Sequence, residues 1–259
     1  MYAAMQAAVQ TTRTVVRYWR IALILASALA TTPLRANDPP PDLVRKVALR
    51  ESETEQAQSN YTYRQTVTIE EVDSHGARSG DYREVREIIF SPTAERTEKL
   101  VGRPELNLHN LILTDEDFRD IREIQPFLLT SDRNFLYETK FRGEEKIEGI
   151  DCFVLQIRPR QILSGQRLFD GLLWIDERDF SISRSEGQAG PQIRTTKVEN
   201  LFPHFTTIRA KVDGALWFPI TTYGDDTLYF RNGPQRVRLT IRYTQYQKFG
   251  ADSKISFGK

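Results

Sequence analysis

The sequence predicts a mainly β domain with two helices (α+β), built as a barrel or a strongly curved antiparallel sheet. From residue 61 onward the chain is a succession of short segments in which apolar and polar residues alternate, as in half-buried strands. Gly, Pro, Asn and Asp separate nearly all of these segments. Only two stretches have the apolar spacing of a helix, and two such helices are enough to cover the concave apolar face of an open sheet.

Residues 1–30 are expected to be a cleavable secretory signal. Three arginines and no acidic residue precede or accompany an apolar run over 21–30, which ends in the small-residue pattern Ala-Leu-Ala. A membrane span needs about 20 apolar residues, so retention as a short anchor is the weaker interpretation. No cysteine follows the run to accept a lipid. We therefore expect a soluble periplasmic protein rather than an acylated lipoprotein.

Composition narrows the function classes. Removal of residues 1–30 takes away three positive charges, so the formal net charge falls from +1 to 1 − 3 = −2. This balance indicates neither a nucleic-acid partner nor tight docking on anionic lipid. Cys152 is the only cysteine, which excludes an intramolecular disulfide, and its apolar neighbours predict a small core residue.

The remaining chain divides into a tether, one domain and a tail. Residues 31–41 are rich in proline and predict an extended tether, 42–250 predict a single domain, and 251–259 predict a C-terminal tail. The first helix is expected over 42–58, with Asp42 as its cap. The second is expected over about 115–125, where Thr114 and Asp117 match a capping box.

Alternation and turn residues place the strands. In the first strand Tyr61, Tyr63, Val67 and Ile69 point one way, whereas Arg64 points the other. Turns are predicted at 73–80, 224–226 and 232–233. The predicted strands cover 61–72, 82–90, 94–101, 135–141, 145–148, 153–159, 169–176, 180–186, 195–201, 206–212, 216–223, 227–231 and 236–246.

Residues for catalysis, metal binding or a cofactor are not evident. The three histidines lie far apart without metal-ligand spacing, and no Gly-x-Ser-x-Gly elbow or glycine-rich phosphate loop occurs. The acidic pairs at 176–177 and 225–226 fall at predicted turns, where carboxylates face water or local amides. We expect no enzyme, no metal and no cofactor; a hydrolase using His204 is the weakest of three hypotheses.

The strongest indication of function is the set of apolar and aromatic residues on the strands and the second helix. They could line a cavity for acyl chains between sheet and helices, or they could form an ordinary filled core, and patterning alone leaves both open. The candidate cavity residues are Tyr61, Tyr63, Val67, Ile69, Phe118, Ile121, Phe153, Leu155, Ile157, Trp174, Ile182 and Phe218.

The last strand carries a basic face. Arg236, Arg238 and Arg242 alternate with apolar residues, so they share one side of the strand. Such a face is either solvated or a docking surface for an acidic partner.

Local motifs give a family resemblance. They are the Tyr-Arg-Gln-Thr-Val-Thr segment at 63–68, the strand end Phe-Ser-Pro at 90–92, and the strand 153–159, which ends in proline and precedes Leu-Trp-Ile-Asp at 173–176. Together with the order of elements over residues 42–246, they resemble the periplasmic outer-membrane lipoprotein carriers, the LolA-like lipoprotein-sorting superfamily. The C-terminal part, 202–250, differs from the short ending of the best-known carriers and resembles the broader, divergent relatives.

The resemblance implies an unclosed β-barrel over amphipathic helices and a non-catalytic carrier or binding function. The ligand would be a lipidated protein or a lipid. The protein would act as a monomer that receives this ligand from a membrane-complex donor protein and passes it to an acceptor protein. Carriers place an arginine early in the barrel that holds the cavity closed, and Arg64 is the matching position. The alternative is an envelope protein-interaction or stress-regulatory module that uses the basic face of Arg236, Arg238 and Arg242.

Overall fold

The computed structural model describes residues 38–90, 95–162, 166–194 and 199–248. The predicted signal, most of the tether and the tail therefore lie outside the described residues. Within those ranges, no helix is long and apolar enough to cross a membrane.

Two α-helices, one short 3-10 helix and thirteen strands make up the described chain. The helices are α1 (Leu43–Gln58), α2 (Asp115–Glu123) and the 3-10 helix η1 (Asn134–Leu136). The strands are β1 (Tyr61–Val72), β2 (Arg78–Phe90), β3 (Arg96–Leu100), β4 (Glu105–Leu106), β5 (Tyr137–Ile147), β6 (Ile150–Pro159), β7 (Leu168–Asp176), β8 (Ile182–Gly190), β9 (Ile193–Arg194), β10 (Glu199–Asn200), β11 (Phe205–Val212), β12 (Leu216–Phe230) and β13 (Gly233–Lys248).

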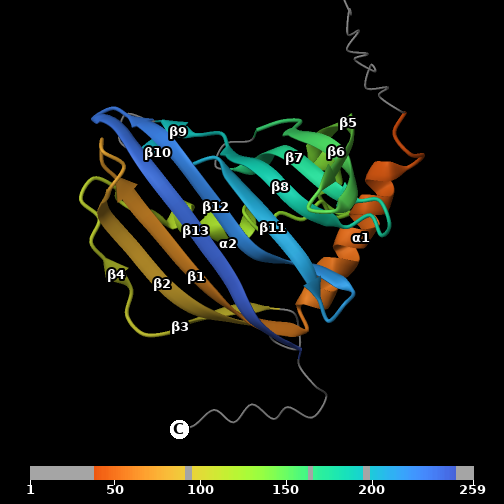
Figure 1. Ribbon diagram of the computed structural model, residues 1–259, viewed down its shortest axis with the longest axis horizontal. Coiled ribbons are helices and arrows are strands. Elements are labelled where there is room, and N and C mark those ends of the chain that lie inside the picture. Colours follow the sequence, from red (N-terminus) through yellow and green to blue (C-terminus); the bar gives the residue numbers. More distant parts are fainter. Residues whose placement is uncertain (1–37, 91–94, 163–165, 195–198, 249–259) are drawn as a thin grey trace, which may run out of the picture. The chain divides into compact units, whose positions relative to one another are not determined.

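One large antiparallel sheet dominates the fold (Figure 1). Its strand order is β3-β2-β1-β13-β12-β11-β8-β7-β6-β5, with β4 pairing β2 beside β3, while β9 and β10 form a separate ribbon. The C-terminal strand β13 lies between β1 and β12, so it joins the N-terminal hairpin to the rest of the sheet. Because β3 and β5 remain edges in this order, the sheet does not close into a barrel. The predicted fold class is confirmed.

The helical layer covers one face of this sheet. Thr207 and Arg209 are both buried on β11, two residues apart. Thr207 Oγ1 donates to the backbone carbonyl of Gln125, just after α2, at 2.8 Å, and Arg209 Nη1 pairs with Glu51 of α1 at 2.8 Å. Figure 1 shows α2 behind the strands and α1 beside the part of the sheet that contains β8 and β11. We call the face that contacts the helices the inner face.

One predicted turn and one predicted break between two strands lie inside continuous strands. The sequence predicts a turn at 224–226, but β12 runs through these residues, and β5 likewise merges the strands predicted at 135–141 and 145–148, with a register shift at Gly143. Within β12, pairing with β13 is continuous, and Asp225 accepts hydrogen bonds from Arg236 and Arg238 of that strand. Cross-strand pairing therefore outweighs local turn propensity.

The two helix starts differ from each other. At α2 the predicted capping box is confirmed: Thr114 Oγ1 accepts from the Asp117 amide, and the Asp117 carboxylate accepts from the Thr114 amide. At α1 the predicted Asp42 cap is wrong, because Asp42 is in a left-handed conformation (φ 58°) and its side chain makes no cap hydrogen bond. Its carboxylate instead accepts from Arg45 at 2.9 Å.

Candidate functional site

The centre of the inner face is filled with side chains. Eight of the predicted cavity residues belong to the main buried core, and Phe118 packs against it: these eight are Tyr63, Val67, Ile69, Ile121, Phe153, Leu155, Ile157 and Ile182. Tyr61 and Phe218 are also buried, and their rings meet edge to face at 5.0 Å. Tyr246 joins them to Tyr63, with ring centroids 5.3 Å from Phe218 and 5.1 Å from Tyr63. Most of the predicted lining is therefore packed core.

Trp174 does not join the other candidates. It lies in a second, smaller cluster with Cys152 and Val154, while its strand neighbours Leu173 and Ile175 belong to the main core. Successive side chains on a strand point to opposite faces, so Trp174 faces away from the helices. Its indole N–H donates to Glu145 at 2.9 Å. The assignment of Trp174 to the cavity was wrong for this reason.

Space is left at the β5 edge of the sheet, on either side of η1. We name the larger hollow the edge groove; it has a volume of about 530 Å³ and lies between the start of α1, η1 and strands β5 and β6. Its apolar lining is Leu43, Val44, Phe135, Tyr137, Phe141 and Leu155, together with Pro39 and Pro40. Of the predicted cavity residues, only Leu155 contributes to it.

A second hollow lies on the other side of η1. This α2 pocket has a volume of about 410 Å³, and its apolar lining includes Ile124, Phe127 and Leu168. Tyr137 lines both hollows, so it forms part of the wall between them. Burial raises the pKa of Tyr137 to about 12. A third apolar cleft, beside Ile112 and Phe202, holds only about 40 Å³ and is too small for an acyl chain.

Buried polar contacts fix α1 above the sheet. Glu51 is fully buried, and its carboxylate accepts from the Ile182 amide at 3.0 Å and pairs with Arg209 at 2.8 Å. Arg209 also donates to the carbonyl of Phe127, which follows α2. One guanidinium thus links α1, the segment after α2 and β11. Sequence reasoning missed both residues, although a charge inside the otherwise apolar stripe of a helix was the available signal.

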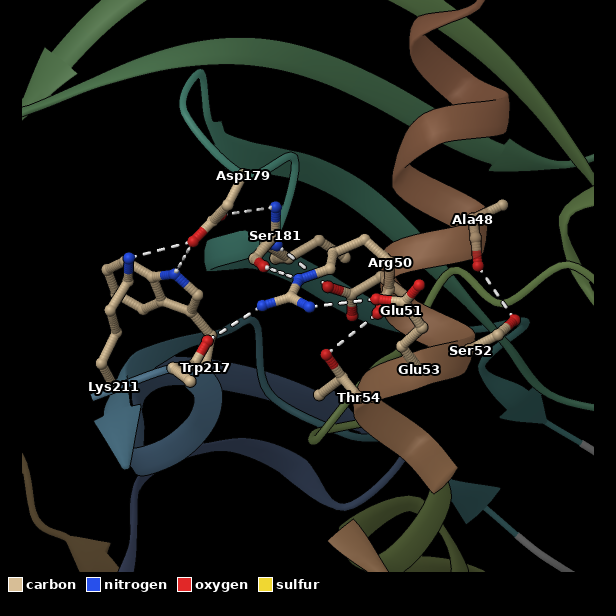
Figure 2. Close-up of polar contacts among 12 residues, drawn as sticks. Ala48, Arg50, Glu51, Ser52, Glu53, Thr54, Asp179, Ser181, Lys211 and Trp217 are labelled. Atoms are coloured by element: carbon tan, nitrogen blue, oxygen red, sulfur yellow. Dashed lines mark hydrogen bonds and ion pairs between the residues drawn. The ribbon is translucent and has the colours of Figure 1, made fainter. Parts of the chain in front are cut away.

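Figure 2 shows a second set of contacts from the same helix. Arg50 donates to Ser181 Oγ at 3.0 Å and to the carbonyl of Ala215 at 2.9 Å, so it reaches two turns of the sheet. Nearby, Asp179 accepts from Trp217 at 3.2 Å and pairs with Lys211 at 3.0 Å. The position of α1, and with it one wall of the edge groove, is therefore set by specific hydrogen bonds rather than by apolar contact alone.

Buried charges also fix α2. Asp120 pairs with Arg167 at 3.0 Å, and the two side chains are 1% and 7% exposed. Desolvation raises the pKa of Asp120 to about 7 even though Arg167 opposes the shift. Asn200 donates to Asp117 at 2.9 Å, and burial also raises the pKa of Asp117. These residues tie α2 to the segments that begin β7 and end β10.

The predicted closing and docking arginines lie elsewhere. Arg64 points away from the inner-face residues of β1; it donates to Glu87 at 3.0 Å and lines a polar hollow of about 320 Å³. Arg64 lines neither the edge groove nor the α2 pocket, so the closing role that the resemblance implies for it stays a prediction. On the basic face, Arg236 and Arg238 both bind Asp225, at 2.7 and 3.1 Å, so only Arg242 of the three has no acidic partner among the described residues.

The described residues contain no group of three or more His, Cys, Asp or Glu side chains that could hold a metal. His204 does approach a carboxylate, but its backbone amide makes the contact, donating to Asp226 at 3.1 Å. This contact gives no support for the hydrolase hypothesis, which requires the imidazole ring.

Comparisons with known proteins give structural likeness only. No protein-family model matches the sequence, and no curated protein does. Among solved structures, a DUF1329 family protein from Desulfovibrio piger matches with 12% identity and a TM-score of 0.40, over 84% of this chain and 96% of that one. A LolA superfamily protein from Nitrosomonas europaea matches with 14% identity and a TM-score of 0.34, over 78% and 94%.

A further match comes from Pseudomonas aeruginosa. The MucA/MucB complex matches with 14% identity and a TM-score of 0.24, over 81% of this chain and 100% of that one. The matched structures thus include LolA superfamily and MucB proteins. One of these matches is a protein of the LolA superfamily, which the sequence motifs also resemble, and its sequence identity to this chain is 14%.

Proposed function

We propose that this protein is a periplasmic, non-catalytic binding or carrier protein for a lipidated protein or a lipid. The observation that supports it is the edge groove, an apolar hollow of about 530 Å³ between α1 and the β5 edge. Ligand sites are typically concave, mostly apolar and a few hundred Å³ in volume. The α2 pocket extends the available space beyond η1.

The site differs from the one that the sequence predicts. The centre of the half-barrel is packed, so an acyl chain would enter at the edge, where Phe135 is 65% exposed and Val44 and Phe141 are partly buried. Burial of an acyl chain against such side chains contributes about 0.8 kcal/mol for each methylene. Eight buried methylenes would therefore contribute roughly 6 kcal/mol before the entropy cost of binding.

The experiment is a binding assay on the purified protein. Solvent extraction and mass spectrometry should find a co-purified acyl lipid, and the delipidated protein should increase the fluorescence of a fatty-acid probe. Addition of a triacylated lipopeptide or a fatty acid should displace the probe. If no lipid co-purifies and neither ligand nor probe binds, the proposal is wrong.

A further inference from the structure

We propose that the edge groove binds a single-chain amphiphile with an anionic head, specifically a long-chain fatty acid, and that Arg160 binds its carboxylate. This inference rests on the proposed lipid-binding function and names the ligand class. It follows from two properties of the groove, its size and the charges at its mouth.

The size suits one acyl chain. A methylene group occupies about the volume of a water molecule in the liquid, about 30 Å³, so a chain of 16 carbons needs roughly 480 Å³. The groove offers about 530 Å³. Three chains of a triacylated lipoprotein would need roughly three times that volume. The volume of one such chain therefore matches the volume of the groove.

The charged side chains that line the groove have a net positive charge. Asp42, Arg45 and Arg160 are the charged residues that line the groove. Asp42 and Arg45 pair with each other at 2.9 Å, so they neutralise one another. The exposed Arg160 side chain makes no ion pair or side-chain hydrogen bond with any described residue. The groove is left with one uncompensated positive charge beside an apolar surface.

Backbone structure holds Arg160 in place. Its amide donates to the carbonyl of Leu136 at 2.8 Å, which fixes the chain after β6 against η1. A guanidinium binds a carboxylate through two parallel charge-assisted hydrogen bonds. The chain can therefore offer an apolar tail site and an anion-binding donor group in the same hollow, which matches the two parts of a fatty acid.

The α2 pocket lacks this complementarity. Its lining contains three arginines and three acidic residues, and Arg167 and Arg133 already pair with Asp120 and Glu55, at 3.0 and 3.2 Å. The formal charges of the residues that line the α2 pocket therefore sum to zero. An anionic amphiphile therefore favours the edge groove.

The test compares two ligands that differ only in the head group. Calorimetry with the full-length protein should give laurate an affinity at least fivefold higher than dodecanol at low salt. Raising the salt should weaken laurate binding and leave dodecanol binding unchanged, because screening acts on the charged pair alone. Arg160→Gln should remove the preference for laurate without loss of dodecanol binding.

The matched control is Arg158→Gln. Arg158 is an exposed arginine of β6 that does not line the groove, and its nearest acidic group is Asp170 at 3.9 Å. This variant should keep the preference for laurate. Equal affinities for laurate and dodecanol, or a preference that Arg160→Gln retains, would overturn the inference while lipid binding stands. Tight binding of a triacylated lipopeptide alone would overturn it too. Absence of binding by every ligand would instead refute the proposed function.

Discussion

The centre and the edge of the inner face are built from the same sheet but differ in how they are filled. At the centre, β1, β12 and β13 contribute aromatic rings that touch one another, such as Tyr63 with Tyr246 and Tyr61 with Phe218. At the edge, β5 contributes Thr139 and Phe141 to the groove, and the rings of Phe141 and Phe153 are farther apart there, with centroids 6.4 Å from each other. The larger hollow on the inner face therefore lies at the edge, where side chains leave space unfilled, and not at the centre.

Polar contacts set the positions of the helices beside the two hollows. The Glu51 and Arg209 pair fixes α1, which lines the edge groove, and Arg167 with Asp120 fixes α2, which lines the α2 pocket. If only apolar contacts positioned the helices, the walls would settle inward and reduce the hollow. The comparison predicts that changes in the centre affect stability and that changes at the edge affect binding.

The largest expected effect is on the buried pair. Glu51→Gln leaves the Arg209 charge without its acidic partner in a site where both side chains are at most 1% exposed. We expect the free energy of unfolding to fall by about 3–5 kcal/mol, as for other broken buried pairs. Urea denaturation followed by circular dichroism measures this change.

Glu53→Gln is the control for that variant. Glu53 lies on the same helix and pairs with Arg50 at 3.0 Å, but its side chain is 66% exposed. An exposed pair contributes about 0–1 kcal/mol, so this variant should stay close to the native protein. Similar losses for Glu51→Gln and Glu53→Gln would show that the buried pair does not fix α1.

Filling the edge groove should affect binding instead of stability. Thr139 lines the groove between Tyr137 and Phe141, and Thr139→Trp would place an indole in the open space. We expect the affinity for a fatty-acid probe to fall at least tenfold, with the urea midpoint nearly unchanged. Lys140→Trp, at the next position and therefore on the other face of β5, should bind the probe normally. Unchanged binding by Thr139→Trp would place the ligand elsewhere.

A smaller effect is expected for pH. The pKa of Asp120 is raised to about 7 in the folded protein, above the ordinary value of about 3.9. Between these values the folded state holds a proton that the unfolded state has released, so stability falls as the pH rises from about 4 to 7. The slope for one group is about 1.4 kcal/mol per pH unit at most. Asp120→Asn should flatten the curve of unfolding free energy in that window; an unchanged slope would contradict the raised pKa.

Local sequence patterns predicted many of the helices and strands, but they did not predict the edge groove. Alternation predicted both ends of β1, and the Thr114 and Asp117 box predicted the start of α2. The groove was not predictable in this way, because its walls come from segments more than 90 residues apart, such as Val44 and Phe141. The partner of Arg209 likewise depends on where α1 lies over β11. Asp225 lies in a segment whose residues favour a turn, but the pairing of β12 with β13 keeps it in a strand.

The smallest expected effect tests the basic face. Arg236 and Arg238 share Asp225 in exposed pairs, so replacing both by Gln should change the unfolding free energy by less than about 1 kcal/mol. If this face docked an acidic partner, Asp225 would compete with that partner for the same two guanidinium groups. Asp225→Asn should then strengthen capture of a hexaglutamate peptide, in a salt-dependent way, and Arg242→Gln should weaken it. We expect none of these variants to alter binding of a fatty-acid probe, because the basic face contributes no residue to the edge groove. A loss of probe binding in the double variant would contradict this separation of functions.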